Sequence, residues 1–136
     1  MSTDGLNRLK SMMPGKFIIE ADFYMMPEPV QEKKNERPFF PYLLMLADHK
    51  SGMILGMEML VPVPSHEAMW KQIPNLLIKN FLKGAAPSEV HLKNEMLNMI
   101  IESLAGKVGF KVKRVSRLSA IESVRKEMEK MMPRMF

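Results

Sequence analysis

The longest apolar pattern in the chain lies between residues 41 and 61, where two apolar runs flank a short polar cluster at 48–52. Such a cluster, with Gly52 available for a positive φ, is typical of a β-hairpin with a turn of four or five residues. Both runs are apolar on both of their faces, and strands of that kind are usually covered on both sides. The pattern therefore predicts a hairpin at the buried centre of a sheet.

Three further strands follow from shorter patterns. Residues 16–26 alternate with a period of two, which predicts a strand and places Glu20 and Asp22 side by side on one of its faces. Residues 89–93 predict a short strand with Val90 and Leu92 directed inward. Residues 110–115 predict a fifth strand that is basic over much of its surface.

Apolar residues at helical spacing predict three helices, over residues 66–83, over residues 95–108 and from Ser119 onward. Ser65 and Asn94 stand where N-caps are expected, and Ser119 with Glu122 has the spacing of a capping box. Pro74 lies inside the first helical pattern, so a kink or two short helices are expected there.

The order of these elements predicts an α/β fold. Residues 1–15 are interpreted as a flexible lead-in, and residues 16–136 as a single domain. The order within it is β-β-β-α-β-α-β-α. Three sequential strands form an antiparallel meander, and the β-α-β units that follow require parallel strands joined by right-handed crossovers. The prediction is a five-stranded mixed sheet with helices on both faces.

Composition narrows the class of protein. The 136 residues are 46% hydrophobic and 26% charged, which is typical of a soluble globular domain. The absence of cysteine excludes disulfides, thiolate metal sites and a cysteine nucleophile. No apolar run is long enough to span a bilayer and the amino terminus lacks the apolar core of a signal peptide, so a cytoplasmic protein without a membrane partner is expected.

The net charge of +5 is concentrated in the second half of the chain. Residues 1–66 carry seven basic and eight acidic side chains, whereas residues 67–136 carry thirteen and seven. A run without acids there contains Lys107, Lys111, Lys113, Arg114 and Arg117. Two interpretations stay open: Lys111, Lys113, Arg114 and Arg117 bind nucleic acid or an acidic protein, or they keep an edge strand soluble.

The chain is rich in methionine, with sixteen residues, several of them at helical spacing near the carboxyl end. Methionine fills irregular gaps in a core, and we interpret most of these residues in that way. A self-associating structural domain that uses the methionine-rich last helix is a further hypothesis. The three histidines, His49, His66 and His91, lack a metal-binding spacing, so neither a metal site nor a cofactor is predicted.

Four segments together resemble the ribonuclease H-like superfamily, particularly the catalytic core of integrases and transposases; the same hairpin also resembles that of a group of uncharacterised prokaryotic domains. Residues 17–22 resemble its first strand with an acid, and residues 44–56 its hairpin between the second and third strands, with Asp48 at the turn. Residues 89–97 resemble the fourth strand and the helix start after it, and residues 104–112 the entry into the fifth strand. The resemblance extends from about residue 16 to residue 132 and implies the sheet described above.

Nucleases of this superfamily hold two metal ions with three carboxylates, so the resemblance also implies a site. Its first acid falls on Glu20 or Asp22, and its third matches Glu122 loosely. The second position is Asn94, preceded by Lys93. An uncharged amide is a weaker ligand than a carboxylate and an ammonium group repels Mg²⁺, so the pattern is broken at its second member.

Three functional hypotheses follow. The first is a non-catalytic ribonuclease H-like binding module with a degenerate active site, whose candidate surface is Lys111, Lys113, Arg114 and Arg117. The second is a divergent nuclease that uses Glu20, Asp22 and Glu122 with Mg²⁺ or Mn²⁺. The third is the self-associating domain, which implies a homo-oligomer.

Overall fold

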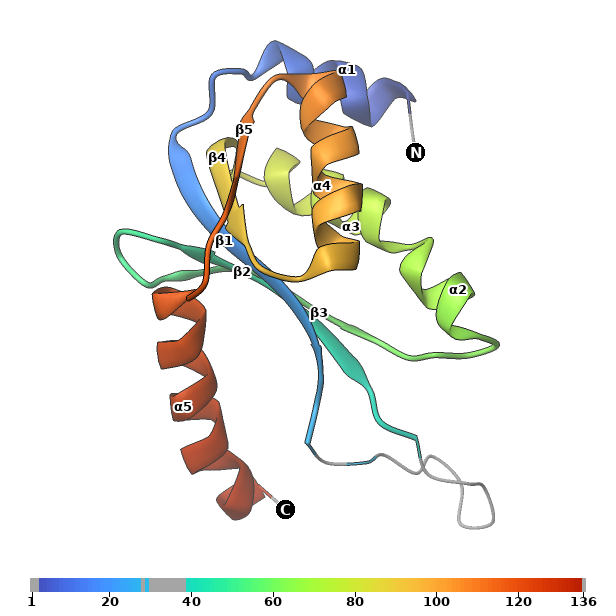
Figure 1. Cartoon of the computed structure of the whole chain (residues 1–136), viewed down its shortest axis with the longest axis vertical. Helices are drawn as coiled ribbons and strands as arrows, with labels where there is room; N and C mark the ends of the chain where they lie inside the picture. Colours follow the sequence, from blue (N-terminus) through green and yellow to red (C-terminus); the bar gives the residue numbers. More distant parts are fainter. Residues whose placement is uncertain (1–2, 28, 30–38, 136) are drawn as a thin grey trace.

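The computed structural model describes residues 3–27, 29 and 39–135. Its ten elements follow one another in the predicted order, except that α1 precedes β1 and that the predicted helix over 66–83 is divided in two (Figure 1). The strands are β1 (Phe17–Met25), β2 (Tyr42–Asp48), β3 (Ile54–Leu60), β4 (Pro87–Leu92) and β5 (Lys111–Arg114). The helices are α1 (Thr3–Ser11), α2 (His66–Trp70), α3 (Ile73–Leu82), α4 (Glu95–Val108) and α5 (Ser119–Met135).

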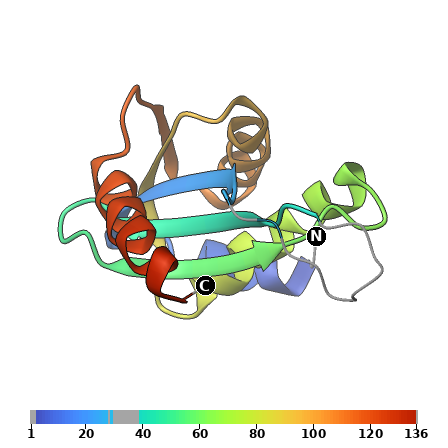
Figure 2. The same ribbon diagram turned by 90° about the horizontal axis from the view of Figure 1, so that it is seen from below.

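The five strands form one mixed sheet in the order β3-β2-β1-β4-β5. β2 is antiparallel to both of its neighbours, β1 and β3, and β4 is parallel to both of its neighbours, β1 and β5. Viewed from below, β1, β2 and β3 lie side by side with β3 outermost (Figure 2). The predicted mixed five-stranded sheet is therefore confirmed.

Helices cover the two faces of the sheet unequally. α1, α3 and α4 lie on one face, where residues such as Ile19, Leu44, Phe81 and Leu97 form the main core. α5 lies alone on the other face and packs on β1 and β2 (Figure 1). The side chains of a strand point alternately to its two faces, so the sheet separates two cores. In β2, for example, Leu44 belongs to the main core and Leu43 to a smaller core beneath α5. β4 and β5 are left uncovered on the α5 side.

The hairpin at 41–61 forms as predicted, but its second strand is not buried. β2 is buried on both faces through its interior, whereas the positions of β3 are half-buried or exposed up to its last residue, the buried Leu60. Met57 and Met59 are exposed. The prediction of a buried centre is correct for β2 and wrong for β3, because an apolar run alone does not tell a central strand from an edge strand.

The amino-terminal segment departs from the expected lead-in at 1–15. Where it is described, it forms α1, which packs on α3 and α4 and buries Leu9 completely. Gly15 then lies so close to the β4 backbone that a Cβ there would overlap the carbonyl oxygen of Ala86. Two apolar residues, Leu6 and Leu9, are enough to attach this helix, although its sequence is largely polar.

The helix boundaries follow the predicted signals. The Ser65 hydroxyl accepts a hydrogen bond from the Ala68 N–H at 3.1 Å, and the Asn94 side chain accepts one from the Leu97 N–H at 3.0 Å. The predicted helix over 66–83 is divided into α2 and α3, with Pro74 in the first turn of α3, where its missing N–H is not needed. In the described part of the chain, no helix is long and apolar enough to cross a membrane.

Candidate functional site

Polar side chains gather on the α5 side of the sheet, at the start of α5 and beside it. Alternation along β1, β4 and β5 places every second side chain there, opposite the main core. We call this group the polar sheet face; it consists of Glu20, Asp22, His49, Glu89, His91, Lys93, Lys111 and Lys113. The pairing register sets Glu20 beside His91 and His91 beside Lys113, so acids, imidazoles and ammonium groups alternate across the strands.

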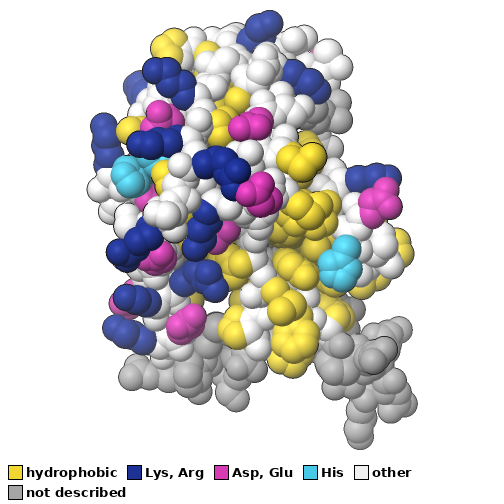
Figure 3. Space-filling view, in the orientation of Figure 1, with side chains coloured by type: hydrophobic (Ala, Val, Ile, Leu, Met, Phe, Trp, Pro, Cys, Tyr) yellow, Lys and Arg dark blue, Asp and Glu magenta, His cyan; other side chains and the backbone are white. Residues whose placement is uncertain are grey.

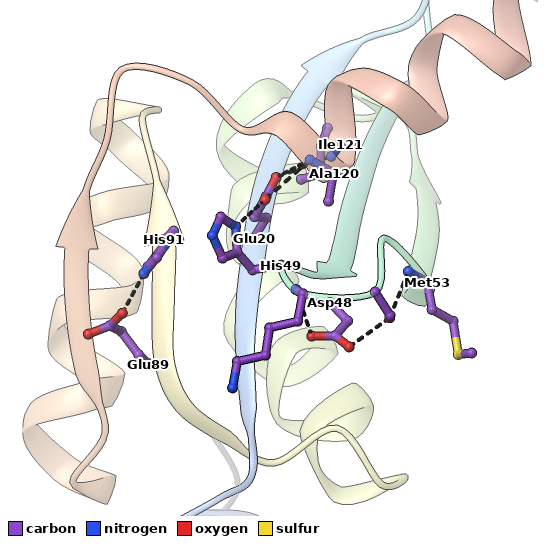
Figure 4. Close-up of polar contacts among 10 residues, drawn as sticks. Glu20, Asp48, His49, Met53, Glu89, His91, Ala120 and Ile121 are labelled. Atoms are coloured by element: carbon purple, nitrogen blue, oxygen red, sulfur yellow. Dashed lines mark hydrogen bonds and ion pairs between the residues drawn. The ribbon is translucent and has the colours of Figure 1, made fainter.

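Glu20 lies at the centre of this face and is 1% exposed. Its carboxylate accepts hydrogen bonds from the backbone N–H groups of Ala120 at 3.0 Å and Ile121 at 3.1 Å, in the first turn of α5 (Figure 4). It also lies 2.6 Å from Nδ1 of His49. The first N–H groups of a helix have no partner within the helix and carry partial positive charge, so this buried carboxylate caps α5 from another element.

The predicted capping box at the start of α5 does not form. Ser119 is already the first helical residue, and the preceding position is the apolar Leu118. The Glu122 carboxylate accepts a hydrogen bond from Arg117 at 3.0 Å, which lowers its pKa. Because the local sequence offers no suitable side chain, the cap comes from Glu20, a hundred positions earlier.

Two histidines meet on the polar sheet face. The ring centroids of His49 and His91 are 5.0 Å apart, and each ring contacts a carboxylate (Figure 4). His91 is buried and bonds to Glu89 through Nε2, a contact that lowers the pKa of Glu89. The His49 side chain is 42% exposed. Each imidazole is therefore oriented by an acid.

Among the acids of the polar sheet face, Asp22 is the one whose burial is offset least by hydrogen bonds and neighbouring cations. It is 5% exposed and accepts a hydrogen bond from the Phe23 N–H at 3.0 Å. Burial raises the pKa of Asp22, although that hydrogen bond and the cations Lys93 and Arg125 act in the opposite direction. The folded chain therefore holds the proton of this carboxyl group more tightly than the unfolded chain does.

Replacing Asp22 with asparagine tests this pKa shift. The proton on Asp22 stabilises the fold fully below the ordinary pKa of aspartate, and this contribution is lost as the pH rises through the raised pKa. Asp22→Asn is therefore expected to raise the Tm by a few degrees at about pH 7 and to leave it unchanged at about pH 3. Asp48→Asn should lower the Tm at neutral pH, because a hydrogen bond from Ser51 lowers the pKa of Asp48. Thermal melts of both variants that show the same sign would contradict this assignment.

Two of the three acids of the implied nuclease site, Glu20 and Glu122, are engaged by other groups. Glu20 and Asp22 share the polar sheet face, but Glu20 is engaged by α5 and Glu122 turns toward Arg117. Within the described residues, no three histidine, aspartate or glutamate side chains are grouped so that they hold a metal ion. Asn94 caps α4 and donates a hydrogen bond to the Phe23 carbonyl at 3.1 Å, which ties the start of α4 to β1.

The predicted basic residues lie on and just after β5, the exposed edge of the sheet opposite β3. Arg114 pairs with Glu95, and Arg117 pairs with Glu122. Lys111 and Lys113 make no salt bridge with any described residue, and they project onto the polar sheet face. Lys and Arg side chains form a band over β5 and α5, with acids interspersed (Figure 3). The four predicted residues thus divide into two paired arginines and two available lysines.

A family model described as a domain of unknown function (DUF6930) matches residues 5–129. The chain belongs to the DUF6930 family. Comparison with curated proteins finds no match. The DUF6930 match begins inside α1 and ends inside α5, so it includes the whole sheet and every residue of the polar sheet face.

On the sequence of this DUF6930 chain, Lys93 or His91 is an expected partner of Glu20 and Asp22 across the sheet, whereas His49 was missed. The proximity of His91 follows from the parallel pairing of β1 with β4, which sets Glu20 beside His91. The available signal was the alternation of Glu89, His91 and Lys93 on one strand face. Alternation could have grouped these three, but only the register relates them to β1.

Proposed function

We propose that the chain is a ribonuclease H-like binding module that holds single-stranded nucleic acid on its β5 edge. The sheet supports the ribonuclease H-like part of the proposal, because the hairpin supplies β2 and β3 and because β1 and β4 run parallel beside each other. These are the features that the sequence resemblance implies. The family match is consistent with this proposal and does not name an activity.

The observation that carries the proposal is the pair Lys111 and Lys113 on the β5 edge. Neither makes a salt bridge with a described residue, although Glu89 lies beside Lys111 and interacts electrostatically with both. Lys93 lies just after the neighbouring strand β4 and interacts electrostatically with Asp22 and Glu122. Phosphate groups bind most readily to ammonium groups that are not already neutralised. A strand of nucleic acid running along β5 would meet both lysines from the open side of the sheet.

The acids of the face support a binding role over a nuclease role. The Glu20 carboxylate already accepts two backbone N–H groups and contacts His49, so binding a metal ion would remove the cap of α5. In the divergent nuclease with Mg²⁺ or Mn²⁺, Glu20 could therefore act as a ligand only if α5 moved away, which leaves Asp22 as the first acid. We assign Glu20 a structural role and Lys111 and Lys113 the contact with phosphate.

The salt dependence of binding tests this function. The affinity for a single-stranded oligonucleotide is measured by fluorescence anisotropy over a salt series, for wild type and for Lys111→Ala/Lys113→Ala. Losing two phosphate contacts should weaken binding for all base sequences alike and reduce the slope of log affinity against log salt by about one per lysine. Lys10→Ala/Lys71→Ala is the matched control, because both lysines are exposed and lie on the α1 and α2 side.

The outcomes separate clearly. An unchanged slope in the control, with a reduced slope in the β5 variant, supports the proposal. Absence of binding by wild type at low salt would overturn it. Binding of an acidic polypeptide, such as polyglutamate, in preference to the oligonucleotide would point to an acidic protein partner instead.

A further inference from the structure

The two edges of the sheet carry opposite kinds of side chain. β5 carries Lys111, Lys113 and Arg114, and charged residues of this type keep other strands from pairing with an edge. β3 carries large apolar side chains, with Glu58 as its only charged residue. An apolar edge strand without lysine or proline presents unpaired backbone groups to another strand.

The exposed apolar side chains of β3 lie on one face. Ile54, Met57 and Met59 are 44%, 41% and 61% exposed. They stand opposite Ala47, Met45 and Leu43 of β2, which belong to the core beneath α5. A groove between the start of β3 and α5 continues the apolar surface. It is lined mainly by Ile54, Val124, Met128 and Met131.

The geometry of β3 restricts how another strand can pair with it. An irregularity between residues 46 and 47 of β2 interrupts the register near Leu55, so β3 is regular over residues 56–60. Antiparallel pairing of two such segments about a two-fold axis at Glu58 sets Met57 of one copy opposite Met59 of the other. Two symmetric methionine contacts then cover the most exposed side chains of the strand.

The charged groups of β3 are compatible with a second copy of this chain on that edge. The Glu58 carboxylate lies 2.9 Å from the Lys79 ammonium group and also accepts a hydrogen bond from Asn80. The proposed register sets the two Glu58 residues directly opposite each other. Because each is already paired with its own Lys79, their mutual repulsion is reduced. The two positive β5 edges would lie about 43 Å apart, at nine strand spacings of about 4.8 Å. This distance is much longer than the screening length of about 8 Å, so the two edges would repel each other little.

We propose that two copies of this chain pair antiparallel through residues 56–60 of β3, forming one ten-stranded sheet with a basic edge at each end. The interaction extends the hypothesis of self-association and moves it from the last helix to the edge strand. It also gives a dimer two nucleic-acid edges if the proposed function holds, although the pairing itself does not depend on that function.

The first test measures mass in solution by sedimentation equilibrium over a concentration series. Wild type should approach twice the 15.7 kDa of one copy. Met59→Lys adds a charge at the proposed interface and should shift the chain to the mass of one copy, with an unchanged circular dichroism spectrum. Met99→Lys is the matched control, because Met99 is 71% exposed on α4, and this variant should still form dimers. Met57→Lys repeats the test at the opposing position.

A second test uses the absence of cysteine in the chain. An equimolar mixture of Met57→Cys and Met59→Cys chains should form an interchain disulfide under mild oxidation far more readily than either chain alone, because those two positions face each other. A wild type that remains at the mass of one copy would overturn the proposal. Dimers that survive both lysine substitutions, or a mixture that cross-links no better than its components, would overturn it equally.

Discussion

Replacing Glu20 with alanine is expected to lower the free energy of unfolding by about 2–4 kcal/mol. The substitution leaves the first N–H groups of α5, those of Ala120 and Ile121, without their buried acceptor and also removes the contact with His49. A lost hydrogen bond to a charged group costs about 1.5–3 kcal/mol, and a buried donor without a partner adds to that cost. Glu20→Gln should be intermediate, because its amide oxygen can still accept. Urea denaturation followed by circular dichroism measures the difference.

The loss of stability caused by Glu20→Ala should be largest in α5. Leu118 and Ile121 pack on Met45 and the rest of the smaller core, so a weakened helix start should increase hydrogen exchange in the first turns of α5 before it affects α3 or α4. Glu122→Gln is the control; Glu122 is exposed and pairs with Arg117, so little change in stability is expected. A Glu20→Ala variant as stable as wild type would show that the carboxylate is not the cap of α5.

Replacing Gly15 with alanine is expected to destabilise the fold by about 1–3 kcal/mol, the usual cost of forcing extra volume into a packed site. A Cβ at this position would overlap backbone atoms of Ala86 and Pro87, which cannot rotate away as a side chain can. The close approach joins the segment after α1 to the start of β4. The variant should therefore weaken both α1 and the parallel pairing of β1 with β4, and thermal unfolding should show a lower Tm.

Gly106→Ala is the matched control for Gly15→Ala. Gly106 lies inside α4, and a Cβ there has no neighbour within 4 Å. Alanine is the better helix former by about 0.8–1.0 kcal/mol, so this variant should be more stable than wild type. Two glycine-to-alanine changes of opposite sign would support the close contact at Gly15. A Gly15→Ala variant with the stability of wild type would contradict it.

The sequence was most informative where structure depends on neighbouring residues. Alternation along β1, the spacing of Leu97, Ile101 and Leu104 in α4, and the caps Ser65 and Asn94 are local patterns, and the structure has all of them. Chain order then constrained the sheet, because parallel strands need a crossover connection. These rules were sufficient to predict the mixed five-stranded sheet.

The site could not be predicted in the same way because its contacts are non-local. Glu20 appeared in the sequence as one of two acids on a strand, and its partners lie a hundred residues later. His49 and His91 come from a turn and a strand that only the sheet register brings together. The edge position of β3 was missed for a related reason: its residues are as apolar as those of β2, and only the strand order leaves them exposed.

The most direct test of the account follows the backbone amide signals of the isotope-labelled chain by NMR during titration with a single-stranded oligonucleotide at low salt. The account predicts the largest shifts at Lys111 and Lys113, smaller shifts at Lys93, and unchanged signals along residues 54–60 of β3. Shifts confined to β3 or to the α1, α3 and α4 side, or no shifts at all, would contradict the assignment of the β5 edge as the binding surface.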